Sequence, residues 1–330
     1  MELDTHATLS VAPMMDWTDR HCRAFHRVMS RRTLLYTEMV TAAALVRGGA
    51  VHLLDFDAAE HPVALQLGGS DPLELARATA LAVERGYAEV NLNVGCPSDR
   101  VQSGHFGAVL MEQPDLVARC VAEMINAAGD VPVTVKCRIG VDDQTPEEVL
   151  PDFLARIRDA GVRRVTVHAR KAWLQGLSPK ENRDIPPLDY ELVYRMATAF
   201  PDLHLSINGG ITTLDEVAGH LRHMKGVMVG RAAYHDPAAI LMRADTRIFG
   251  AESDPCPTRH DAVLAMVPHI EAHLDAGGKL GQVTRHMLGT FAGQPGARGW
   301  RRTLSEGATR PGAGIDVLHE ALSCVTEAAA

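Results

Sequence analysis

"EVNLNVGCPSDR", residues 89–100, alternates charged or amide side chains with Val90, Leu92 and Val94, and then meets a glycine, a cysteine and a proline. Strict alternation predicts a β-strand with one apolar face, and the glycine and the proline predict its end. Two alternatives follow for Cys96. It is a small buried residue, which is the commoner place for a free cysteine, or the strand ends in an active site.

Seven other segments resemble this strand, and helical patterns separate most of them. These helices are predicted to begin at caps formed by Asp71, Thr145 and Thr213 and to end at glycines. Eight strands alternating with helices over about 240 residues predict a (β/α)8 TIM barrel. An open doubly wound sheet would usually carry a G-x-G-x-x-G turn after its first strand, where this chain has "APMMDW". The other predicted strands are 9–14, 34–40, 63–69, 133–140, 163–170, 203–210 and 226–232.

The last quarter of the chain of 330 residues follows a different pattern. After about residue 250 three segments have helical apolar spacing and no strand alternates with them. We therefore predict a barrel domain over 1–248 and a small helical domain over 249–330. Six scattered cysteines without a C-x-x-C pair argue against a zinc site or a disulfide framework. No apolar run reaches membrane-spanning length and no signal-peptide pattern precedes the barrel, so we expect a cytoplasmic protein.

Polar residues fall at the predicted carboxyl ends of successive strands, where TIM barrels place their chemistry. The set holds no carboxylate pair of the kind glycosidases use and no cluster typical of a metal site, so we expect no metal. An amide, a lysine, a histidine and two glycine turns suit flavin mononucleotide (FMN), because Lys136 can balance charge on the reduced ring and glycine N–H groups can bind phosphate. The complete set at the predicted strand ends is Gln66, Asn93, Cys96, Lys136, Arg138, His168, Asn208, Gly209, Gly210, Gly230 and Arg231.

Each of these residues also has a plain structural explanation. His168 could be a core histidine, and "NGG" at 208–210 could be an ordinary turn. A lysine pointing into a barrel mouth is costly without an anionic partner, so a purely structural Lys136 is disfavoured. Their joint occurrence in register favours the active-site interpretation.

Several longer stretches resemble the tRNA-dihydrouridine synthases, and most closely the A branch, which reduces uridines 20 and 20a of the tRNA D-loop. The resemblance runs in order along nearly the whole chain. It rests on "APMMDWTDR" (12–20), "NLNVGCPSDRVQSGHFGA" (91–108), "VTVKCRIGVDD" (133–143), "VHARKAWLQGLSPKENRDIPPLDY" (167–190), "INGGI" (207–211), "VMVGRAAY" (227–234) and "RHMLGTFAGQPGARGWRRTLS" (285–305).

This resemblance implies a flavin-dependent reduction of the uracil C5–C6 bond. In that family NADPH reduces FMN, hydride passes from the flavin to uracil C6, and a cysteine at the position of Cys96 protonates C5. Cys96 must therefore keep its proton until it acts. Asn93 would hold the uracil or its sugar. The implied cofactor contacts are Ala12, Pro13, Met14, Gln66, Lys136, His168, Asn208, Gly209, Gly210, Gly230 and Arg231.

Two basic segments indicate how tRNA is held. Residues 163–183 and 279–310 each contain six Lys or Arg and one acid, a net charge of +5 in a chain of −8. Either they are solvated loops or they attract a phosphate backbone. A flipped base requires backbone contacts to offset the cost of unstacking. We therefore predict tRNA contacts by Lys180, Arg183, Arg298 and Arg301. Trp173 and Trp300 are expected to pack rather than stack on bases, and no obligate protein partner is evident.

Three other functions remain open at this point. A flavin barrel acting on a free small molecule, of the dihydroorotate dehydrogenase type, would not need the basic segments or the helical domain. A non-catalytic tRNA-binding protein would not need Cys96 and Lys136. A flavin-free lyase using Lys136 as a Schiff base would leave Gln66 and Asn93 without a task.

Overall fold

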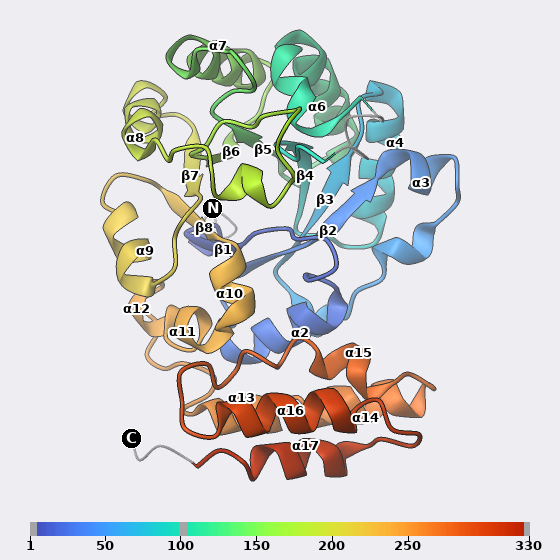
Figure 1. Ribbon diagram of the computed structural model, residues 1–330. Coiled ribbons are helices and arrows are strands. Elements are labelled where there is room, and N and C mark those ends of the chain that lie inside the picture. Colours follow the sequence, from blue (N-terminus) through green and yellow to red (C-terminus); the bar gives the residue numbers. More distant parts are fainter. Residues whose placement is uncertain (1–4, 99–104, 327–330) are drawn as a thin grey trace.

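A closed barrel of eight parallel strands forms the centre of the protein (Figure 1). The computed structural model describes residues 5–98 and 105–326. Residues 99–104 of the 91–108 motif and the outer ends of the two predicted domains lie outside this description. The strands follow one another around the barrel in chain order, and β1 pairs with β8 to close it. The predicted TIM barrel is therefore confirmed.

All eight predicted strands are present, and most are shorter than their sequence pattern. The pattern overshoots because apolar residues continue into the buried loops at the barrel mouth. The strands are β1 (Leu9–Val11), β2 (Leu34–Thr41), β3 (Val63–Gly68), β4 (Glu89–Val94), β5 (Val133–Arg138), β6 (Arg164–His168), β7 (His204–Asn208) and β8 (Gly226–Val229).

Helices connect the strands and surround the barrel. The Asp71 side chain accepts a hydrogen bond from the Glu74 N–H, and Thr213 forms the expected capping box. The cap predicted at Thr145 forms through its backbone carbonyl instead, which accepts from the N–H of Glu148. The α-helices are α2 (Arg20–Met29), α3 (Ala42–Val46), α4 (Pro72–Glu84), α6 (Pro114–Ala128), α7 (Pro146–Asp159), α8 (Tyr190–Ala199), α9 (Leu214–His220), α10 (Arg231–His235), α11 (Pro237–Leu241) and α12 (Ala244–Arg247). Short 3-10 helices are η1 (Val51–Leu54), η2 (Ala58–Glu60), η3 (Gly107–Glu112) and η4 (Glu181–Arg183).

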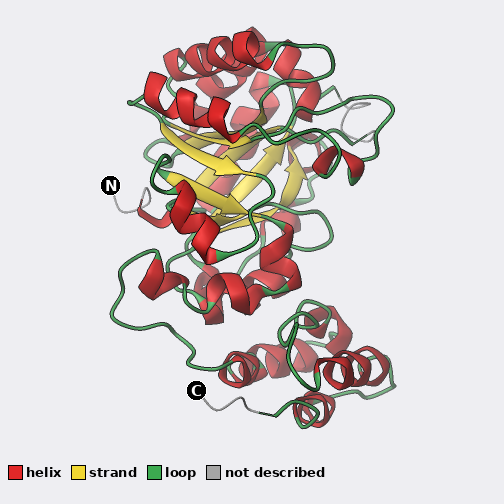
Figure 2. Cartoon of the chain, turned by 60° about the vertical axis from the view of Figure 1, so that its left-hand side comes forward, coloured by secondary structure: helices red, strands yellow, loops and turns green. Residues whose placement is uncertain are grey.

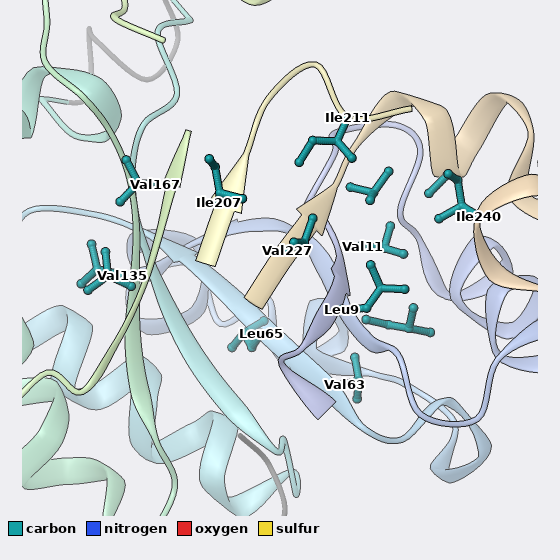
Figure 3. Close-up of a cluster of buried hydrophobic side chains, with 14 of the residues drawn as sticks. Leu9, Val11, Val63, Leu65, Val135, Val167, Ile207, Ile211, Val227 and Ile240 are labelled. Atoms are coloured by element: carbon teal, nitrogen blue, oxygen red, sulfur yellow. The ribbon is translucent and has the colours of Figure 1, made fainter. Parts of the chain in front are cut away.

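The outward side chains of the strands form the main core with these helices. Figure 3 shows Leu9, Val11, Val227 and other apolar strand residues, with Ile240 of α11 on the same side as Val11. The barrel interior has a smaller apolar cluster, which comprises Ala7, Ala12, Leu34, Tyr36, Ala64 and Met228. On β4 the alternation places Glu89, Asn91 and Asn93 opposite the apolar residues, and all three are buried. The interior is therefore apolar near β1, β2 and β8 and polar along β4.

Five helices follow the barrel and lie together beside α2 (Figures 1 and 2). Trp300 is fully buried among them, where its indole N–H donates to the Met287 carbonyl at 3.1 Å. None of the helices in the described ranges has the length and apolar character that crossing a lipid bilayer requires. The five helices are α13 (Arg259–Leu264), α14 (Val267–Asp275), α15 (Leu280–Thr284), α16 (Ala297–Gly307) and α17 (Ile315–Leu322).

Candidate active site

A cavity of about 940 Å³ opens at the carboxyl ends of the strands. Its lining comes from the loops after β1, β4, β6, β7 and β8 and from side chains of β2, β3, β5 and β6. Because strand ends meet at one rim of a closed barrel, residues far apart in the chain share this cavity. The predicted residues that line it are Ala12, Pro13, Met14, Gln66, Asn93, Cys96, Lys136, Arg138, His168, Arg183, Asn208, Gly209, Gly210, Gly230 and Arg231.

The loop that carries Cys96 is held by the last asparagine of β4. The Asn93 Oδ1 accepts from the backbone N–H groups of Gly95 and Cys96, each at 3.0 Å. Its Nδ2 donates to Gln66 Oε1 at 2.8 Å. Asn93 therefore fixes the loop conformation, a contact that the prediction of a substrate-binding role did not include. The Cys96 thiol is half-buried and lies 3.5 Å from the Ser98 hydroxyl.

The side chain of Lys136 on β5 places a positively charged ammonium group at the cavity. Burial, with the nearby Arg138 charge, lowers the pKa of Lys136 from 10.5 to about 8. Among the described residues no carboxylate forms an ion pair with it. A partly buried cation without a partner is unfavourable, so the position favours an anionic or electron-rich ligand beside it.

His168 stands at the end of the neighbouring strand, β6, and is buried. Burial, followed by the charges of Arg138 and Lys136, lowers the pKa of His168 well below its ordinary value. The ring is therefore neutral at physiological pH. A neutral imidazole can donate one hydrogen bond and accept another without adding charge to the site.

Glycines form the wall after β7. Gly209 has φ of +117°, and a Cβ there would lie 2.7 Å from the His168 ring. Gly210 has φ of +73°, and a Cβ there would lie 2.7 Å from Leu188. Both positions require glycine for backbone conformation as well as space. Gly230, after β8, has no atom nearer than 3.8 Å to such a Cβ, so its backbone faces open cavity.

Arg138 is a residue whose role the sequence did not define. Its guanidinium is buried and donates to the Gly95 carbonyl at 3.1 Å, to the Lys171 carbonyl at 3.1 Å and to the Asn182 carbonyl at 3.0 Å. It thereby ties the Cys96 loop to the long loop after β6. The alternation along β5 places an arginine at the strand end, but nothing local indicates which carbonyls it binds. Cavity residues that the sequence did not single out include Met39, Phe106 and Thr212.

The predicted tRNA contacts fall in two places. Arg183 lies at the cavity, near the predicted cofactor contact Arg231, which pairs with Asp184 at 2.6 Å. Lys180 is exposed on the same β6 loop but does not line the cavity. Arg298 and Arg301 are exposed on α16, and their spacing of three places them on one helix face.

Neither basic segment is a uniform patch. Arg164 begins β6, is buried, and pairs with Glu89 inside the barrel. Arg164 stands at the amino end of β6 and His168 at the carboxyl end. Since the two ends of a barrel strand open on opposite faces, Arg164 lies on the face opposite the cavity. Arg285 pairs with Asp19 of the α2 cap at 2.6 Å. The expected packing of Trp300 is confirmed. Trp173 is 38% exposed and lies beneath the Lys171 ammonium group, so for this residue packing stays a prediction.

The barrel and its cavity define a (β/α)8-barrel enzyme with its site at the carboxyl ends of the strands. The sequence matches the family described as dihydrouridine synthase (Dus) over residues 10–329. The chain therefore belongs to the dihydrouridine synthase family.

Similar sequences agree with this family assignment, and similar solved structures agree with the fold. The chain is 56% identical over 321 residues to a tRNA-dihydrouridine(20/20a) synthase of Vibrio cholerae serotype O1, covering 97% of each protein. It is 57% identical over 320 residues to that of Escherichia coli strain K12, covering 96% of this chain and 91% of the relative. The fold is similar to an old yellow enzyme homologue from Zymomonas mobilis, with a TM-score of 0.52, 11% identity, and coverage of 70% of this chain and 86% of that one. It is also similar to morphinone reductase, with a TM-score of 0.51, 13% identity, and coverage of 76% and 88%.

Proposed function

We propose that this protein is a flavin-dependent tRNA-dihydrouridine synthase that reduces the C5–C6 bond of uridines 20 and 20a in the tRNA D-loop. The observation that carries the proposal is Cys96, held on a capped loop at the rim of a cavity that also contains Lys136 and His168. Near-full-length identity above one half to relatives named for this activity supports the same substrate. The enzyme would act in the cytoplasm, where its tRNA substrates are found.

The cavity fits FMN. Lys136 supplies a cation without an ion-pair partner in the described part of the chain, suited to the polar edge of the isoalloxazine ring. Gly209, Gly210 and Gly230 offer backbone without side chains, suited to a phosphate group. The volume of about 940 Å³ lies in the range of cofactor sites. The residues that would hold FMN are Ala12, Pro13, Met14, Gln66, Lys136, His168, Asn208, Gly209, Gly210, Gly230 and Arg231.

FMN, reduced by NADPH, supplies the hydride for uracil C6 when it is bound. The Cys96 thiol then gives its proton to C5, on a loop whose position is set by Asn93 and Arg138. Lys136 holds positive charge beside the reacting groups. His168, being neutral, contributes hydrogen bonding without opposing Lys136. No metal ion has a role in this scheme.

The tRNA would be held by exposed cations on two parts of the chain. Arg183 stands at the cavity and Lys180 on the same loop, while Arg298 and Arg301 present charge from α16. Asn93 donates one amide N–H to Gln66, and its other N–H, which has no acceptor among the described residues, would meet the flipped uridine. We assign residues 1–248 to the catalytic barrel and 249–330 to a helical tRNA-binding domain, an assignment supported by the separate packing of Trp300 among the last helices.

The test is direct. The purified protein should carry the visible absorbance of bound flavin, and NADPH should bleach it. Incubation with NADPH and tRNA from a strain lacking the enzyme should produce dihydrouridine at positions 20 and 20a, and free uridine should remain unreduced. Reduction of a free pyrimidine at a comparable rate, with no change in tRNA, would contradict the proposal.

A further inference from the structure

A chain of hydrogen bonds runs inside the barrel from a buried ion pair to the Cys96 loop. It begins at Glu89, which is 0% exposed and pairs with Arg164 across the barrel interior. It continues through Thr134, Asn91, Gln66 and Asn93. Glu89, Asn91 and Thr134 do not line the cavity, so they lie beneath it.

The ion pair sets the direction of the first bonds. A carboxylate paired with arginine only accepts hydrogen bonds. Tyr36 donates its hydroxyl to Glu89 at 2.6 Å, and Thr134 donates its hydroxyl to the same oxygen. Burial and the neighbouring Glu89 raise the pKa of Tyr36 well above its ordinary value, so Tyr36 keeps its proton. Because Thr134 already donates its only hydroxyl hydrogen to Glu89, its oxygen can only accept a further hydrogen bond.

The same reasoning fixes the orientation of three amide side chains in turn. Asn91 turns its Nδ2 to the Thr134 oxygen at 2.8 Å, so its Oδ1 faces Gln66. Gln66 donates its Nε2 to that oxygen at 2.8 Å, which turns its Oε1 to Asn93. Asn93 donates its Nδ2 to Gln66 at 2.8 Å, which turns its own Oδ1 to the loop.

The other end of the chain demands the same order. The Asn93 Oδ1 accepts from the N–H groups of Gly95 and Cys96, and backbone N–H groups only donate. Turning over any one amide would set donor against donor or acceptor against acceptor at both of its contacts. A buried unpaired polar group costs more than a hydrogen bond contributes. The two ends therefore fix one orientation of all three amides.

We propose that Glu89, Thr134 and Asn91 are positioning residues for the reaction at Cys96. They act through Gln66 and Asn93, which they hold in the orientation that caps the Cys96 loop. A consequence for the site is that Asn93 offers the cavity an N–H donor and no acceptor, because its oxygen already has two partners. The link to catalysis rests on the proposed function, whereas the link to the loop conformation does not.

The experiment compares two pairs of side chains at position 134 that differ by the hydroxyl group: Thr with Val, and Ser with Ala. Thr134→Val keeps the volume and removes the hydroxyl, while Thr134→Ser removes a methyl group and keeps the hydroxyl. Thr134→Ala compared with Thr134→Ser repeats the test in a smaller side chain and replaces Thr134→Val if that variant does not fold. Thr166→Val is the matched control, because Thr166 is a buried threonine on the adjacent strand that does not belong to the chain of hydrogen bonds.

Two readouts are measured on the FMN-loaded protein. The first is the rate at which iodoacetamide alkylates Cys96, with the exposed Cys324 as internal reference. Thr134→Val and Thr134→Ala should raise the Cys96 rate by about threefold to tenfold, the equilibrium effect of one hydrogen bond. The second is dihydrouridine formation, where kcat should fall by a similar factor and KM for tRNA should not change.

The ranking of the variants separates positioning from packing. Thr134→Ser and Thr166→Val should behave like the native protein in both readouts. If packing alone matters, Thr134→Ser will be worse than Thr134→Val, and the proposal is overturned. It is also overturned if the Cys96 alkylation rate in Thr134→Val and Thr134→Ala stays within twofold of native. If the native protein forms no dihydrouridine, the proposed function fails, yet the alkylation rates still decide whether the chain positions the loop.

Discussion

His21 of α2 and His269 of α14 share one hydrogen bond, 2.9 Å between Nδ1 and Nε2. The bond requires one ring to donate and the other to accept, so both rings cannot be protonated while it is kept. His273 also packs edge-on against His21, with ring centroids 4.4 Å apart. Acid should therefore weaken the junction between the barrel and the C-terminal helices.

The magnitude follows from the pKa of His21. Burial lowers this pKa from 6.5 to about 4; the Asp19 carboxylate opposes the shift, and the neighbouring His273, His269 and Arg20 add to it. The folded protein thus binds fewer protons than the unfolded chain. The contribution of neutral His21 to stability is complete above pH 6.5 and is lost as the pH falls towards 4. With a pKa of 6.5 in the unfolded chain and about 4 in the folded protein, the free energy of unfolding falls by about 2 kcal/mol between pH 7 and pH 5.

The assay is urea unfolding at pH 7 and pH 5 of the native protein and of His21→Gln. Glutamine does not titrate and can still bond to His269, so the variant should lose about 2 kcal/mol less on acidification. The pKa of the buried His26 is lowered to about 3, which acts in the same direction in both proteins and cancels in the comparison. Asp19 has a pKa below its usual range, which matters only below about pH 4. Hydrogen exchange should locate the extra opening in α2 and α14.

Equal acid sensitivity of the native protein and His21→Gln would refute this reasoning. So would a variant that is more acid-sensitive than the native protein. Either result would mean that the imidazole rings at this junction are not held neutral by the fold.

Three further predictions concern the proposed activity. Cys96→Ala should bind FMN and oxidise NADPH normally but lose dihydrouridine formation by about 10²–10⁴-fold, the usual contribution of a general acid; a native rate on tRNA would exclude Cys96 as the proton donor. Lys136→Ala should purify with less FMN or accept hydride from NADPH more slowly, measured by flavin absorbance and stopped-flow bleaching; full flavin content with normal bleaching would remove Lys136 from the cofactor site. Replacing four cations by glutamine should weaken tRNA binding and flatten its salt dependence by about 0.7–0.9 in slope for each phosphate group that is no longer bound; an unchanged slope would show that these side chains are merely solvated. NADPH oxidation should be unchanged in the triple variant that keeps Arg183, because the other three side chains do not line the cavity. The four are Lys180, Arg183, Arg298 and Arg301.

The sequence alone determined the barrel and the residues at its rim. Alternation such as that of residues 89–94 reports which face of a strand is buried, and capping residues such as Asp71 and Thr213 report where helices begin. These signals are local, so they survive without knowledge of the partners. Position at a strand end then predicted that Cys96, Lys136 and His168 would share one cavity, because every parallel barrel brings those ends together.

Only the tertiary structure decided what the polar residues bind. Arg164 counted as part of a basic segment, yet it neutralises Glu89, 75 residues earlier, inside the barrel. Asn93 was assigned to the substrate, yet its oxygen caps the Cys96 loop. His21 and His269 meet across 248 residues. Such partners depend on strand register, barrel closure and the docking of the last helices, and no local pattern of apolar and polar residues encodes them.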